Sequence, residues 1–468
     1  MALTRRQLLA GAGATTLAAA GVYELAERVG RAPARPAAGP RAPEQHLLQG
    51  LRVVVDNQVD VVVPPLHHEV VTLRLAVSGA AAMREAQRAL ELALQSVEAD
   101  YEPTPAGLGV TVGWGLPYFR AHVPGPSRTH MPLDRRAAAA AGHPVPVLLD
   151  AIRFPSDPED VVLETHDAAL LLRSDVPDHI RSAHRRLVDD LDVWRPTTIR
   201  RGFVGGGFDG APSLPRRIAV AAGVPGAELV PEHAELFLGF TSTQRAALGP
   251  GTIANIETLG YSDGGPGGYF RRGTVMHVSH IFEDLESWFL TFDHGQRAAT
   301  VFGSARRVPA GTLTVPEGPR EAATVAGILR DAHRTARIGH SPAIQTTSRL
   351  QHDAVGPDGT RYAKGTAVPQ RADFNTLDNP FAWSDQPGRD GMQAGVRAGL
   401  HFVVFNPTSD DFHRNRLAMD GVLPDGTRTP LSPRDPGQGF NSVLTTTHRQ
   451  SFLVPPRARR ALPLAELL

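Results

Sequence analysis

Several short segments rich in Val, Leu and Phe predict β-strands, because their apolar residues are bounded by polar or glycine-rich stretches. In the first of them, residues 70–77, apolar and polar positions alternate with the period of two that a half-buried strand requires. The remaining predicted strands span residues 108–113, 167–173, 235–240, 274–282, 399–405 and 450–454.

Four segments between these strands predict helices, at residues 83–97, 176–191, 284–292 and 411–419. In the second, Ile180, Ala183, Leu187 and Leu191 fall on one stripe, as in an amphipathic helix. The order strand–helix–strand–strand occurs twice along the chain. We therefore expect an α+β fold built from two ferredoxin-like halves. We place these halves at residues 44–215 and 216–468, with residues 1–43 outside both.

The first residues indicate a targeting segment. Thr4-Arg5-Arg6-Gln7-Leu8-Leu9 has the form of a twin-arginine signal, and the apolar run over residues 8–20 is too short to span a bilayer stably. We expect export by the twin-arginine route to the periplasm, the cell envelope or the medium, with no stable membrane span after cleavage. An uncleaved N-terminal anchor is the alternative. The Pro/Ala/Arg-rich residues 28–43 predict a disordered tether.

Composition limits the chemistry that the chain can perform. The 48 basic and 48 acidic residues cancel, so bulk charge gives no reason to expect nucleic acid as a partner. The absence of cysteine from the sequence excludes disulfides, thiolate-bound haem and iron–sulfur clusters. Any bound metal must therefore be held by His, Asp or Glu, and 19 histidines are available.

A glycine-rich stretch, Gly206-Gly-Phe-Asp209-Gly210, holds one carboxylate where small neighbours allow a large group to approach. With the segments Val110-Thr-Val-Gly-Trp-Gly-Leu-Pro-Tyr-Phe119, Gly268 to Trp288, Ala398 to Phe405 and Phe452-Leu-Val-Pro-Pro456, it resembles the dye-decolorizing (DyP-type) haem peroxidase family. The similarity extends from about Val70 to Leu464, with the motifs in the family's order. It implies two ferredoxin-like halves that form a dimeric α/β-barrel-like body.

The resemblance implies a haem b cofactor and assigns three site residues. Asp209 matches the distal aspartate that transfers a proton, and Arg371 matches the distal arginine that stabilises the departing oxyanion. His352 matches the axial ligand, with Asp353 as a partner for its second ring nitrogen. The sequence departs from the family pattern here, with His352-Asp-Ala in place of His-Ile/Val-Arg and with no doubled arginine at Arg371.

Other residues extend or compete with this assignment. His340, in Arg337-Ile-Gly-His-Ser-Pro, is a competing axial ligand. Leu400, Phe402 and Phe405 would line the haem, or else form ordinary strand core. His277 and His280, three positions apart on a predicted strand, point to opposite faces and do not form a shared metal site.

The resemblance therefore implies a peroxidase that reduces hydrogen peroxide and oxidises a small aromatic or dye-like substrate outside the cytoplasm. The altered residues near His352 and Arg371 leave two other functions open. One is a protein of the same fold that binds haem or another ligand without catalysis, and the other is an exported protein that handles haem or iron. The sequence favours no oligomeric state.

Overall fold

The computed structural model describes residues 40–208, 213–241, 257–258, 260, 262–303, 307–316, 324–356, 359–377 and 397–468. The twin-arginine segment and most of the tether, and also Asp209, lie outside these described residues. Among the described residues, no helix is both long enough and apolar enough to cross a membrane.

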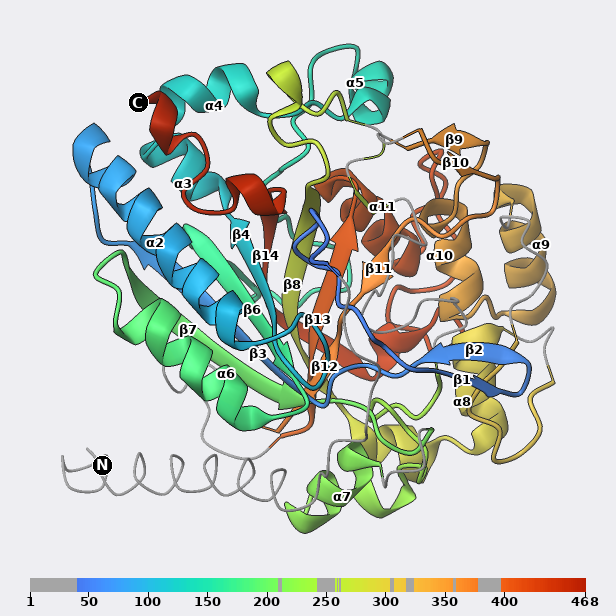
Figure 1. Ribbon diagram of the computed structural model, residues 1–468. Helices are drawn as coiled ribbons and strands as arrows, with labels where there is room; N and C mark the ends of the chain where they lie inside the picture. The colour runs from blue at the N-terminus through green and yellow to red at the C-terminus, as the bar shows by residue number, and fades with distance from the viewer. Residues whose placement is uncertain are drawn as a thin grey trace, which may run out of the picture.

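The N-terminal half contributes four strands in the order β7-β3-β6-β4, with α2 (Ala80–Asp100) and α6 (Pro177–His184) packed on their outer face (Figure 1). The strands are β3 (His67–Leu75), β4 (Gly109–Trp114), β6 (Ala168–Ser174) and β7 (Trp194–Phe203). Numbered along the chain, this order is 4-1-3-2 with antiparallel pairing, the arrangement of a ferredoxin-like unit.

The C-terminal half repeats this arrangement with the order β14-β8-β13-β12. Its strands are β8 (Thr274–Glu283), β12 (Phe374–Thr376), β13 (Gly399–Asn406) and β14 (Leu444–Val454). Its helices include α8 (His294–Phe302), α9 (Val325–Thr335), α10 (His340–Ser348) and α11 (Ser409–Met419). The two ferredoxin-like halves expected from the sequence are thus confirmed in the strand order.

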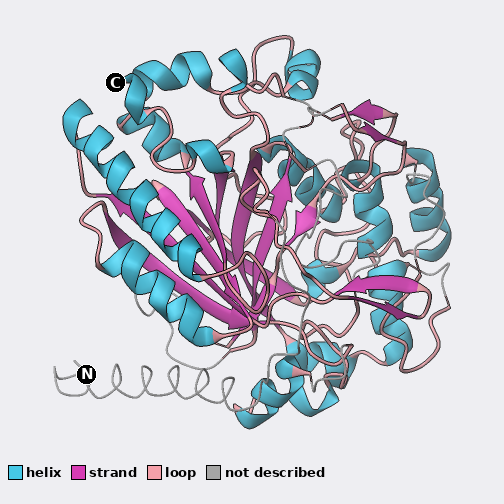
Figure 2. Ribbon diagram, in the orientation of Figure 1, coloured by secondary structure: helices cyan, strands magenta, loops and turns pink. Residues whose placement is uncertain are grey.

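The two halves join into one ten-stranded sheet, which also contains β5 (Val162–Leu163) and β11 (Gln370–Arg371). β12 pairs with β7, β14 pairs with β4, and β8 pairs with both β13 and β14, so the sheet closes on itself. Figure 2 shows the strands gathered at the centre with helices around them. The interior of this barrel holds an apolar cluster from both halves that includes Val70, Leu171, Met276, Phe405 and Phe452.

The remaining short elements lie around this body. They are β1 (Val53–Asp56), β2 (Val59–Val62), β9 (Ala354–Val355), β10 (Arg361–Tyr362), α3 (Leu116–Ala121), α4 (Pro124–His130), α5 (Arg135–Ala141) and α7 (Leu214–Ala221). The predicted strand at residues 235–240 is wrong, because these residues form bends and turns. The predicted helix at 284–292 is present over residues 285–291 and contains a π-helical turn, Ser287–Thr291.

Candidate active site

A large cavity lies on the outer face of the C-terminal sheet. Its floor is formed by side chains of β8 and β13, and α10 and α11 supply the opposite wall. The cavity has a volume of about 200 Å³. Since neighbouring strands are antiparallel and in register, Ile281 lies beside Leu400 and Ser279 lies beside Phe402 on this floor. The apolar side chains of Ile281, Leu400 and Phe402 therefore lie side by side on the floor.

Side chains of a strand point alternately to its two faces, so only some of the predicted lining residues reach the cavity. Leu400, Phe402 and Val404 share one face of β13 and line it. Phe405 points the other way, is fully buried in the barrel interior and lies against His46, with 4.8 Å between ring centroids. The structure thus brings Leu400 and Phe402 to the cavity but not Phe405, because adjacent residues of a strand face opposite sides.

Arg371 lines the cavity from β11, beside Val404 of β13. Its Nη1 donates a hydrogen bond to Oδ2 of Asp373 at 3.0 Å, and the backbone N–H of Val403 donates to Oδ1 of the same carboxyl group at 3.1 Å. Burial raises the pKa of Asp373 to about 6, although the Arg371 charge and the Val403 hydrogen bond oppose the rise. Asp373 therefore lines the cavity together with Arg371.

His340 lines the cavity from the first turn of α10, so it faces the sheet that carries Arg371. Its ring packs against Phe440 at 4.6 Å between centroids, and no described residue forms a hydrogen bond with it. Burial, together with the charges of Arg371 and Arg416, lowers the pKa of His340 to about 3. The imidazole is therefore neutral and has a ring nitrogen available, as a metal ligand requires.

Close backbone packing fixes the position of His340. Gly339 has φ of 88°, and a Cβ atom there would lie 2.4 Å from the backbone nitrogen of Gly303. A Cβ atom on Gly439 would lie 3.1 Å from Cα of His340. Glycine at these positions lets the start of α10 approach α8 and the 439 loop closely, which sets the imidazole at the cavity wall.

His352 lies elsewhere. It is exposed in the connection before β9 and does not line the cavity. Strand β9 lies at the edge of the molecule in Figure 1. Asp353, expected to accept a hydrogen bond from His352, instead accepts one from the backbone N–H of Lys364 at 2.9 Å. Although His352 and Arg371 are close in the sequence, His352 does not reach the site, because it lies at the β9–β10 hairpin and away from α10. The structure brings together Arg371 and His340, the competing ligand.

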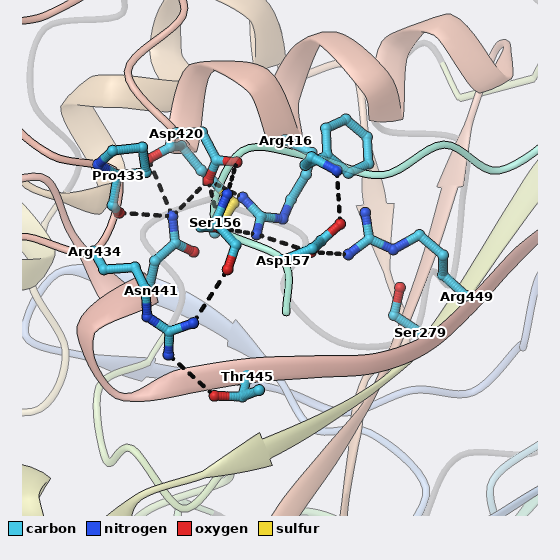
Figure 3. A network of polar contacts seen from close by, with 12 residues as sticks. Ser156, Asp157, Ser279, Arg416, Asp420, Pro433, Arg434, Asn441, Thr445 and Arg449 are labelled. Atoms are coloured by element: carbon cyan, nitrogen blue, oxygen red, sulfur yellow. Dashed lines mark hydrogen bonds and ion pairs between the residues drawn. The ribbon is translucent and has the colours of Figure 1, made fainter. Parts of the chain in front are cut away.

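Two further arginines line the cavity where α11 meets β14. Asp157 holds both: its Oδ1 accepts a hydrogen bond from Nη2 of Arg449 at 2.5 Å and lies 3.5 Å from Nη2 of Arg416 (Figure 3). Arg416 also bonds to Asp420 and to Ser156. The carboxylates of Asp157 and Asp420 fix the two guanidinium groups at this wall of the cavity and balance their charge.

The two nearby histidines of β8 face opposite sides of the sheet, as expected. The ring of His277 stacks on Phe412 of α11 at 3.4 Å between centroids, while that of His280 lies 5.1 Å from that of His401 in the barrel interior. In the described part of the chain, no group of three or more His, Asp or Glu side chains is arranged to hold a metal ion.

Comparisons with known proteins agree with this architecture. A DyP-type peroxidase from Cellulomonas bogoriensis is similar over 89% of this chain and 96% of its own, with a TM-score of 0.51 and 17% identity. DypB from Rhodococcus jostii RHA1 and an encapsulated DyP-type peroxidase from Mycobacterium smegmatis each cover 86% of this chain and 95% of their own, with TM-scores of 0.48 and 13% identity. The chain has the DyP-type peroxidase fold.

The sequence places the chain in a family. Residues 65–456 match the model of a family of unknown function, DUF7405, and the chain belongs to that family. No curated protein matches the sequence significantly.

The cavity fits a haem in three respects. The floor of Ile281, Leu400 and Phe402 suits a flat apolar ring, and Arg416 and Arg449 suit its carboxylates. The neutral, unbonded imidazole of His340 suits an axial position.

Proposed function

We propose that this protein is an exported haem b peroxidase, which reduces hydrogen peroxide and oxidises a small aromatic substrate. The observation that carries the proposal is that His340 and Arg371 line opposite walls of one apolar cavity. The DyP-type fold supports the same class of activity. Export rests on the twin-arginine segment of the sequence alone.

In this proposal His340, in place of His352, would bind the iron of haem. Leu400 and Phe402 would contact the ring, and Arg416 and Arg449 would hold the propionates. Bound haem would supply the redox-active iron that the protein itself lacks. Burial keeps the imidazole of His340 neutral. This matters because only the neutral ring can ligate a metal.

The polar groups on the sheet side would act on the bound peroxide. Arg371 stabilises negative charge on a peroxide oxygen with its fixed guanidinium donors. Asp373, with a pKa of about 6, controls near neutral pH how firmly the guanidinium of Arg371 is held. Asp209 stays a predicted proton-transfer residue, as it lies outside the described residues.

The test is reconstitution of the purified protein with hemin, followed by peroxide-dependent oxidation of a dye. We expect turnover that depends on hemin and is reduced by Arg371→Leu but not by His352→Ala. Hemin binding without turnover would reject the peroxidase assignment. It would favour a second function, a haem-binding protein without catalysis, for which the pairing of Arg371 with Asp373 is the supporting observation.

A further inference from the structure

Glu283, at the end of β8, is a buried acid to which the proposed chemistry gives no role. Its side chain lines the cavity, yet the residue is only 6% exposed. Neither carboxyl oxygen has a hydrogen-bond partner in the described part of the chain. An unsatisfied buried carboxyl group is costly for a folded protein, so its presence at a cavity wall points to a partner that is not protein.

The surroundings of Glu283 are apolar. Its backbone N–H donates to the carbonyl oxygen of Ala398 at 3.0 Å, and its neighbour on β14 is Leu444. Val301 and Phe302 of α8 line the same cavity. The nearby charged groups are Asp373, which acts on Glu283 electrostatically, and Arg397, whose guanidinium lies over the ring of Phe282.

The strand register separates the backbones of Glu283 and Arg371, because Arg371 pairs with Val404 whereas Glu283 is bonded to Ala398 of the same strand. Their side chains are linked through Asp373, which is bonded to Arg371 and acts electrostatically on Glu283. A ligand that fills the cavity can therefore meet both Glu283 and Arg371.

We propose that Glu283 is a recognition residue that holds its proton at neutral pH and donates a hydrogen bond to a carboxylate or carbonyl oxygen of the cavity's ligand. The ligand class is a largely apolar molecule that carries such an oxygen. Naming haem as that ligand rests on the proposed function. Burial, reinforced by the charge of Asp373, raises the pKa of Glu283 to about 8, which keeps the donor form present at pH 7.

The first experiment uses the ligand-free protein. An infrared titration should show a protonated carboxyl band at pH 7 that disappears at about pH 8 and is missing from Glu283→Gln. The exposed Glu228→Gln is the control and should leave the band unchanged. A wild-type spectrum without this band, or a band that survives in Glu283→Gln, would overturn the proposal.

The second experiment measures hemin binding at pH 6 and pH 9. Wild-type affinity should fall roughly tenfold at the higher pH, as the donor is lost and a buried negative charge appears. Glu283→Gln keeps an N–H donor and should bind equally at both pH values, whereas Glu283→Leu should bind roughly tenfold more weakly at pH 6. Equal binding by Glu283→Leu and wild type would overturn the recognition role.

Esterified hemin tests whether a propionate meets Glu283, because the propionates carry the only oxygens of haem b and esterification removes their charge. If a propionate meets Glu283, the pH dependence should be weaker for the ester, since ionised Glu283 no longer repels a carboxylate. An unchanged pH dependence would show that no propionate lies there. These outcomes are separate from the proposed function. Hemin binding without peroxide turnover would reject the peroxidase and leave Glu283 as a recognition residue. A protein that binds no hemin would reject both haem as ligand and the proposed function, while the infrared band still decides whether Glu283 holds the proton.

Discussion

Arg371 and Asp373 form an ion pair at the cavity wall, with 3.0 Å between Nη1 and Oδ2. Asp373 is fully buried and Arg371 is partly exposed toward the cavity, so the pair places a fixed cation where a ligand can reach it. The ionisation of Asp373 therefore affects how freely the guanidinium of Arg371 can bind a ligand.

Peroxide turnover should increase as the pH falls through about 6. Below this pH Asp373 becomes neutral, and its hold on Arg371 weakens, which frees the guanidinium for a peroxide oxygen. Because the fold raises the pKa of Asp373 above its ordinary 3.8, stability from this group is present at low pH and lost as the pH rises through about 6. Asp373→Asn should flatten this part of the pH–rate profile; an unchanged profile would show that another group controls it.

Arg371→Leu should reduce kcat for peroxide by roughly 10²–10³-fold, the usual effect of removing a donor that stabilises developing charge. Hemin affinity should change little, because Arg416 and Arg449 are placed to hold the carboxylates. Stopped-flow kinetics of the hemin-loaded protein measures this effect. Equal loss of hemin binding and of turnover would instead make Arg371 a ligand-holding residue.

Phe402 and Phe405 lie on opposite faces of β13 and should respond differently to truncation. Phe402→Ala should weaken hemin binding roughly tenfold with little change in stability, as Phe402 is only partly buried and lines the cavity. Phe405→Ala should lower the free energy of unfolding by about 3–5 kcal/mol, because it empties part of the barrel interior. Denaturant unfolding and hemin titration of both variants test this contrast, and the reverse pattern would contradict the assigned faces.

Glu283→Leu should stabilise the ligand-free protein, and more so as the pH rises. The fold raises the pKa of Glu283 to about 8 from an ordinary 4.5, so wild-type stability declines between these values as the unfolded chain releases its proton more readily. Thermal unfolding at pH 5, 7 and 9 should show a growing gain in Tm for the variant. A gain that does not depend on pH would mean that Glu283 has an ordinary pKa.

The sequence was sufficient for the two ferredoxin-like halves, because β3, β8 and β13 carry clear apolar segments in the expected order. β7 was missed since its alternation is polar: Arg200 bonds to the buried Glu164 across the barrel interior. Polar residues that face a buried polar group look like a solvated loop in the sequence.

The site was predicted in part for a similar reason. Arg371, Leu400 and Phe402 reach the cavity as expected. The helix α10 was not predicted, because its sequence has no apolar stripe. Its cavity face consists of His340, Ser341, Ile344, Gln345 and Ser348, and such a mixed face gives no helical period. The useful signal was the glycine directly before His340, which allows close packing at the start of α10.

The absorption spectrum of the hemin-loaded protein tests the central claim most directly. Wild type and His352→Ala should both show the Soret band of a histidine-bound haem, and His340→Ala should lose it while keeping the wild-type circular dichroism. Loss of the band in His352→Ala, with the band retained in His340→Ala, would contradict the site described for this cavity.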